Sequence, residues 1–376
     1  MYRKQPFFRM KSWGATNGER ADAQEIRLPQ DATDAHARES AAFAPWRAWV
    51  CLALLLVAEL LTIAVPPLGL AVYALLLIGV LAYGAMGWQG PERNLILGLA
   101  LVPLLRLLSL ALPLSTFHRL LWYPLVMLPI MNATRLAART AGLSREAMGL
   151  RVGNLPLQLA AAPVGLGIGV IEYLILRPQP LVAGDTRVMY GLAALTLIIF
   201  AGFGEELVFR GLLLPLAQSA MKGWGIVYVS ALFAALHVVY RSPAEVLLMF
   251  AFSVLLALFA SKSRSILGVS LAHGLANVTL FLVMPEIEHE PFFGIAVAAL
   301  LGCSVVALAW ATWSIYRLGP VEKAHVETSA DAGATGPEAQ QPPPPPDLDR
   351  SPVSGVWTQA TDLQSDEHAD KREEER

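Results

Sequence analysis

Residues 194–211 read ALTLIIFAGFGEELVFRG, an apolar run that leads directly into Glu205, Glu206 and Arg210. The run is continuously apolar and does not alternate with polar residues, which favours a helix over a membrane-barrel strand. A charged side chain in the hydrocarbon region costs at least about 2.5–3.5 kcal/mol, and such residues mark functional sites by default. This stretch therefore predicts a membrane-spanning helix with a charged group at its cytoplasmic side.

Similar apolar runs fill the middle of the chain. A helix satisfies all its backbone hydrogen bonds within one segment, as a membrane requires. The sequence predicts an all-α, polytopic transmembrane helical bundle of about ten spans, with disordered N- and C-terminal tails. The predicted spans are residues 48–65, 67–87, 94–113, 118–133, 155–176, 188–204, 224–240, 244–260, 266–284 and 292–316. The fourth of these is the weakest, because Pro124, Pro129 and Asn132 interrupt it.

The composition supports this interpretation. Of the 376 residues, 55% are hydrophobic and 15% are charged, whereas soluble domains are roughly 25% charged. Lys and Arg number 7 against 6 Asp and Glu in residues 1–46, 16 against 11 in residues 47–317, and 5 against 13 in residues 318–376. The low charge of the middle segment argues against a soluble globular enzyme and places that segment in the lipid bilayer.

Both ends of the chain have the composition of tails. Residues 318–376 include five consecutive prolines and an acidic end, and residues 1–46 are similarly polar. Segments of this kind cannot bury enough apolar surface to form a core.

When the N-terminus is placed in the cytoplasm, most basic loop residues also fall there, as the positive-inside rule requires. We expect an integral protein of a prokaryotic cell (inner) membrane with both termini cytoplasmic.

Two further helices carry polar pairs at one-turn spacing. Phe233 and His237 are four residues apart, and so are His273 and Asn277. Residues at this spacing share one face of a helix. Glu206 precedes its own basic partner by four residues, which is the better orientation for an ion pair. Three apolar helices thus each carry a narrow polar stripe, which indicates a functional site.

Other buried charges are isolated along the chain. Glu59 and Arg106 lie in the first and third predicted spans, where we expect them to form an ion pair with a purely structural role. Glu172 lies near the outer end of its span beside Arg177, where we expect a solvated or paired role. The charges gather on one side of the membrane and form no path across it, which argues against a proton or ion transporter.

The residue types of the three stripes allow two kinds of hydrolysis. Glu205, His237 and His273 form a ligand set that suits Zn²⁺, whose bound water becomes a nucleophile near neutral pH. Alternatively, Glu205 is the general base, His237 orients the water, and His273 with Asn277 donates hydrogen bonds to the oxyanion. Both versions cleave peptide bonds, and the residues leave the choice between them open.

The motifs Glu205-Glu206-x-x-x-Arg210, Phe233-x-x-x-His237 and His273-x-x-x-Asn277 follow one another in this order. In this respect the chain resembles the CPBP family, the CAAX-protease and bacteriocin-processing group of intramembrane endopeptidases. The resemblance implies a membrane-embedded cavity that opens toward the cytoplasm and holds the polar cluster. It covers roughly residues 145–285 and leaves residues 47–140 without an assigned role.

The resemblance also implies roles for the motif residues. Glu205 is the base or a metal ligand, with Glu206 and Arg210 as its supports. His237 is a ligand or orients the water, and His273 is a ligand or an oxyanion donor. Phe233 is expected to pack. The implied catalytic residues are Glu205, Glu206, Arg210, His237, His273 and Asn277, with Zn²⁺ as the metal if the enzyme is metal-dependent.

We therefore expect four segments: the polar N-terminal segment 1–46, a transmembrane region 47–140, a CPBP-like protease domain 141–317 and the tail 318–376. The predicted function is an intramembrane endopeptidase that acts on a prenylated, leader-bearing or membrane-associated peptide or protein within the lipid bilayer. We expect no nucleic-acid partner. The alternative is a non-catalytic membrane scaffold or bacteriocin self-immunity protein that uses the same fold to bind a peptide.

Overall fold

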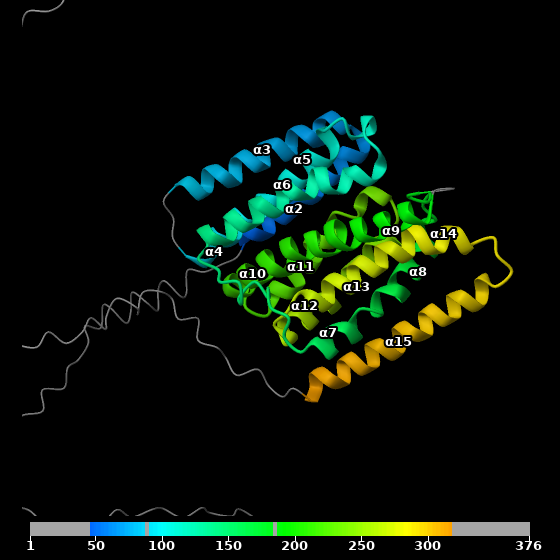
Figure 1. Cartoon of the computed structure of the whole chain (residues 1–376). Helices are drawn as coiled ribbons and strands as arrows, with labels where there is room; N and C mark the ends of the chain where they lie inside the picture. The colour runs from blue at the N-terminus through cyan, green and yellow to red at the C-terminus, as the bar shows by residue number, and fades with distance from the viewer. Residues whose placement is uncertain (1–45, 87–89, 183–185, 318–376) are drawn as a thin grey trace, which may run out of the picture. The chain divides into compact units, whose positions relative to one another are not determined.

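The structure is a computed structural model that describes residues 46–86, 90–182 and 186–317. Within these ranges every regular element is helical, which confirms the predicted all-α bundle (Figure 1). The tail predictions for residues 1–45 and 318–376 lie outside the described residues.

The α-helices are α2 (Trp46–Ala64), α3 (Pro66–Ala85), α4 (Pro91–Leu99), α5 (Leu101–Ala111), α6 (Arg119–Thr140), α7 (Leu155–Ala161), α8 (Val164–Leu176), α9 (Arg187–Thr196), α10 (Leu214–Met221), α11 (Trp224–Ala235), α12 (Pro243–Ser263), α13 (Leu267–Val278), α14 (Met284–Ile287) and α15 (Phe293–Arg317). The 3₁₀ segments are η1 (Leu114–Thr116) and η4 (Val238–Tyr240), and the π-helical segments are η2 (Leu197–Gly204), η3 (Leu207–Leu213) and η5 (Thr279–Val283).

The predicted spans correspond to helices of the described chain, but they do not all have the length and hydropathy of a span. Among the described residues, eight helices are long and apolar enough to cross a membrane. The region 224–240 is a shorter apolar helix, and α6 does not reach the hydropathy of a span. Pro124 and Pro129 lie inside α6 without ending it, and Asn132 donates a hydrogen bond to the carbonyl oxygen of Leu128 at 2.9 Å.

The helix that carries the two adjacent acids is longer than predicted. It runs from Arg187 to Met221, 35 residues, and so continues well past residue 204, where the predicted apolar span ends. At 1.5 Å per residue it extends about 52 Å, beyond the roughly 30 Å of a hydrocarbon core. Glu205 and Glu206 lie near its centre, between the π segments η2 and η3. Such π segments re-aim side chains and are frequent at functional sites.

Close contact between two glycines brings this helix against α13. A Cβ atom added to Gly202 would lie 2.7 Å from the backbone nitrogen of Gly274, and one added to Gly274 would lie 2.8 Å from Cα of Ile198. Small residues at such a crossing allow two membrane helices to approach backbone to backbone. The crossing places Glu205 and Glu206, just after Gly202, beside the histidine of α13.

Cap residues fix the start of α12, directly after the second motif. Oγ of Ser242 accepts the backbone N–H of Glu245 at 3.3 Å, which is a helix N-cap. Pro243 occupies the first helical position, where its missing N–H carries no cost. The chain therefore turns from η4 into α12 within a few residues.

The N-terminal helices α2, α3, α5 and α6 pack against one another and lie side by side in Figure 1. The hydroxyl of Tyr228 in α11 donates a hydrogen bond to the carbonyl of Ala48 in α2 at 2.9 Å. Glu59 and Arg106 form an ion pair between α2 and α5, as expected from the sequence. Residues 47–140 thus contact the part of the chain that carries the motifs.

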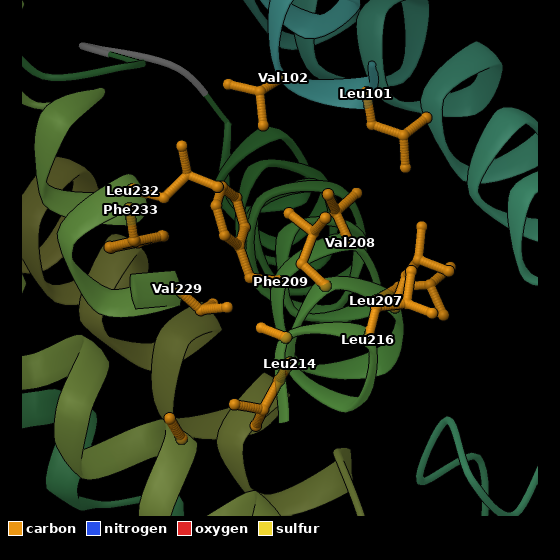
Figure 2. Packing of buried hydrophobic residues seen from close by; sticks show 14 of the residues in the cluster. Leu101, Val102, Leu207, Val208, Phe209, Leu214, Leu216, Val229, Leu232 and Phe233 are labelled. Atoms are coloured by element: carbon orange, nitrogen blue, oxygen red, sulfur yellow. The ribbon is translucent and has the colours of Figure 1, made fainter. Parts of the chain in front are cut away.

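The apolar core continues around η3, which packs against α11 and shares one buried cluster with residues of α5. Figure 2 shows Phe209 of η3 pointing toward Leu232 and Phe233 of α11. The rings of Phe209 and Phe233 pack edge to face with centroids 5.0 Å apart. The buried side chains of this cluster include Leu101, Val102, Leu207, Val208, Phe209, Val229, Leu232 and Phe233. The polar residues of the long helix are therefore set in a closely packed apolar environment.

Candidate active site

Glu206 and Arg210 form a fully buried ion pair on the long helix. Nη1 of Arg210 lies 2.7 Å from Oε1 of Glu206, and both side chains are 0% exposed. Nη2 of Arg210 donates to the hydroxyl of Ser253 at 2.9 Å and to its carbonyl oxygen at 3.2 Å. Arg210 therefore joins the long helix to α12, and the ion pair expected from the four-residue spacing is present.

The same carboxylate oxygen contacts the histidine of α13. Nδ1 of His273 lies 2.8 Å from Oε1 of Glu206. Since a carboxylate only accepts hydrogen bonds, Nδ1 carries the proton that it donates to Glu206. Nε2 of His273 then faces Oε2 of Glu205 at 3.8 Å. The two adjacent acids thus contact opposite nitrogens of one imidazole.

The environments of the two acids differ. The side chain of Glu205 is 30% exposed, whereas that of Glu206 is completely buried. Glu206 is held by Arg210 and His273 and cannot move freely. Glu205 is the accessible carboxylate, which is the arrangement a general base next to a substrate requires.

Phe233 connects the two histidines. Its ring is 1% exposed and lies 4.9 Å from the imidazole of His237 and 5.7 Å from that of His273, measured between ring centroids. The guanidinium carbon of Arg210 lies 5.0 Å from the centroid of the same ring, in a cation–π contact. Phe233 packs, as the resemblance implied, and holds the second and third motifs side by side.

The free nitrogen of His237 is defined by its backbone contact. Nδ1 lies 3.0 Å from the carbonyl oxygen of Phe233, one turn earlier. A carbonyl oxygen only accepts, so Nδ1 is the protonated nitrogen and Nε2 of the neutral ring is an acceptor. An acceptor in this position can orient a water molecule by taking one of its hydrogen bonds.

Asn277 is attached to the third motif through its amide group. Nδ2 donates a hydrogen bond to the carbonyl oxygen of His273 at 3.1 Å. An amide nitrogen carries two hydrogens, so one donor remains for another acceptor. The side chain is partly exposed, which leaves that donor accessible.

The predicted metal ligands are not arranged to hold an ion. No group of three His, Cys, Asp or Glu side chains within residues 46–86, 90–182 and 186–317 is placed to hold a metal. Nδ1 of each histidine faces an oxygen acceptor of the protein, which leaves Nε2 of each ring as the only nitrogen that could act as a ligand. Among the described residues Glu205, His237 and His273 are not placed to hold one ion together, so we derive no step through a metal. Metal dependence itself stays a prediction.

Two buried acids near the site were assigned differently, or not at all, from the sequence. Glu172 does not pair with Arg177, whose Nη1 lies 2.9 Å from Glu288 instead. Glu172 is buried within hydrogen-bonding reach of Glu245, a fully buried acid of α12. The oxygens of Glu245 meet no donor among the described residues. From the sequence, the Ser242 cap and the acid three residues later indicate only a helix start, so Glu245 could not be recognised as part of the site.

The fold and this cluster define a polytopic helical membrane protein with a buried acid–histidine site. A family model described as type II CAAX prenyl endopeptidase Rce1-like matches residues 187–279, which hold all six predicted site residues. This match supports membership of the CPBP family, which the three motifs also indicated, and it supports a CAAX-type protease at the level of the family. Comparisons with curated proteins and with solved structures gave no match.

Proposed function

We propose that this protein is an intramembrane endopeptidase that uses Glu205 as a general base. The observation that carries the proposal is the shared carboxylate of Glu206. It accepts from Arg210 and from His273, while the neighbouring Glu205 stays partly exposed beside the second nitrogen of His273. Two adjacent acids with such different environments are suited to different tasks: one supports the imidazole and the other reacts.

The proposed reaction is hydrolysis of a peptide bond. Glu205 takes one proton from a water molecule, and the water oxygen forms a bond to the carbonyl carbon of the substrate. The tetrahedral intermediate collapses when the carbon–nitrogen bond breaks, and the proton held by Glu205 passes to the departing amine. General acid–base catalysis of this kind contributes about 10²- to 10⁴-fold to a rate.

The other motif residues act on the water and on the oxyanion. Nε2 of His237 accepts a hydrogen bond from the attacking water, because its Nδ1 is committed to Phe233. The free amide hydrogen of Asn277 and, when it is protonated, Nε2 of His273 donate to the oxyanion of the intermediate. Removing one such donor in other hydrolases costs about 10²- to 10³-fold in turnover.

The proposed substrate class rests on the family match and on the membrane-spanning helices of the described chain. By resemblance to the CPBP family, the substrate would be a prenylated, leader-bearing or membrane-associated peptide or protein that enters from the membrane. The basic loops favour a chain with both termini in the cytoplasm of a prokaryotic cell and a substrate presented from that side. Reporter fusions to each end of the chain test this orientation.

Replacement of the gene by its Glu205→Ala form tests the function in cells. Membrane peptides that are normally cleaved accumulate in the variant strain, and proteomics of the membrane fraction detects them. If the protein were instead a non-catalytic scaffold that only binds a peptide, the physiological phenotype would survive both Glu205→Ala and His237→Ala. That outcome would replace the protease proposal.

A further inference from the structure

Glu59 and Arg106 lie in the transmembrane region 47–140, outside the matched segment, but their ion pair reaches the candidate active site. Nε of Arg106 contacts Oε1 of Glu59, whose side chain is only 1% exposed, while that of Arg106 is 15% exposed. The attraction within a buried ion pair often does not exceed the free energy needed to remove both charges from water. A protein with apolar residues of the same volume in place of the pair is often equally stable. A second contact of Arg106 indicates that it does more than form an ion pair that stabilises the fold.

That contact is with the backbone at the end of α11. Nη2 of Arg106 donates a hydrogen bond to the carbonyl oxygen of Leu236. α11 ends at Ala235, and the chain then turns through Leu236 and His237 into η4. The last carbonyls of a helix have no partner within it, and a cation at this end is favourable. Arg106 therefore caps the turn that carries His237.

The guanidinium group also lies near the reacting groups. Its Nη2 contact is with the carbonyl oxygen of Leu236, the residue directly before His237. Arg106 thus joins α2, α5 and the end of α11 at one edge of the cluster.

We infer that Arg106 is a positioning residue of the active site, supplied by the part of the chain that the family match does not cover. It fixes the Leu236 carbonyl and with it the direction of the His237 imidazole. Glu59 holds the guanidinium in the required plane. The catalytic consequence rests on the proposed function, whereas the geometric consequence does not.

Arginine is required because its side chain must donate hydrogen bonds to two acceptors at once, the carboxylate of Glu59 and the carbonyl oxygen of Leu236. The planar guanidinium donates through Nε to one acceptor and through Nη2 to another, whereas the ammonium of lysine is a single point charge on a flexible stem. Arg106→Lys keeps the charge and loses this geometry. Arg106→Gln loses both.

The reactivity of His237 tests the geometric part. The purified full chain in detergent is treated with diethyl pyrocarbonate, and modification of His237 is followed by mass spectrometry with His118 as the internal reference. We expect the rate at His237 to change at least about threefold in Arg106→Gln, because the turn is no longer held. Arg106→Lys should change it in the same direction by less. Arg177→Gln, which breaks the exposed pair with Glu288, is the matched control and should leave the rate unchanged.

A farnesylated fluorogenic peptide is the probe for the catalytic part. In Arg106→Gln, kcat should fall about 10- to 100-fold with little change in KM, as expected when a reacting group is misplaced. Unchanged His237 reactivity in both Arg106 variants would overturn the inference, as would an equal change in Arg177→Gln. If no variant cleaves the probe but His237 reactivity changes as expected, the proposed function fails and the positioning role stands.

Discussion

Oε1 of Glu206 lies 2.8 Å from Nδ1 of His273 and 2.7 Å from Nη1 of Arg210. One buried oxygen atom therefore joins the first and third motifs, and Arg210 extends the connection to α12 through Ser253. The two partners approach it from different sequence positions, one a turn away on the same helix and one 67 residues later. This arrangement makes Glu206 the structural centre of the site and leaves Glu205 for the chemistry.

Glu206→Ala should cost about 3–5 kcal/mol of unfolding free energy, because the charge of Arg210 would remain buried without its partner. The measurement is thermal or denaturant unfolding of the purified protein in detergent. Glu290→Ala, at an exposed acid of the 288–292 turn, is the control and should change little. Equal stability of the wild type and Glu206→Ala would show that the ion pair does not support the fold.

The crossing of the long helix with α13 gives a second prediction. Gly202→Ala should destabilise the protein by about 1–3 kcal/mol, because the added methyl group meets backbone atoms that cannot move aside. It should also separate Glu206 from His273 and lower activity. Gly191→Ala lies on the same helix with open space around it and should be neutral or slightly stabilising. Melting temperatures that place the two variants in the opposite order would contradict this account of the packing.

The paired acids Glu172 and Glu245 give a third prediction. Two carboxylates are acceptors only, so they can hydrogen-bond to each other only when one of them is protonated. Glu245→Gln supplies the missing donor without changing the size of the side chain. We expect stability at neutral pH to rise by about 1 kcal/mol, measured as an increase in melting temperature. A lower melting temperature would mean that the charge of Glu245 is needed for folding.

Much of the site could be predicted from the sequence because its motifs are local. The four-residue spacing of Glu206 with Arg210, and of His273 with Asn277, is a helical signal that needs no tertiary information. The approach of His273 to Glu206 was not predictable in this way. It depends on the close crossing at Gly202, and a glycine in an apolar run does not indicate which helix will contact it.

The parts that were missed depend on partners distant in sequence. The length of the long helix could not be predicted, because Glu205, Glu206 and Arg210 interrupt the apolar run that indicated the span 188–204. In the structure Glu206 and Arg210 stay inside, where α12 and α13 satisfy them. The contact of Arg106 with Leu236 involves a backbone carbonyl, which leaves no trace in the side-chain pattern. The pair with Glu59 could therefore be predicted from the sequence, whereas its connection to the site could not.

The central claim is that Glu205 is the base, and cleavage of one peptide probe by Glu205→Gln tests it most directly. The substitution keeps the size of the side chain and removes its ability to take a proton. With purified protein and a farnesylated fluorogenic peptide, the account predicts that kcat falls about 10²- to 10⁴-fold while the melting temperature stays near that of the wild type. Cleavage by Glu205→Gln at the wild-type rate would contradict it.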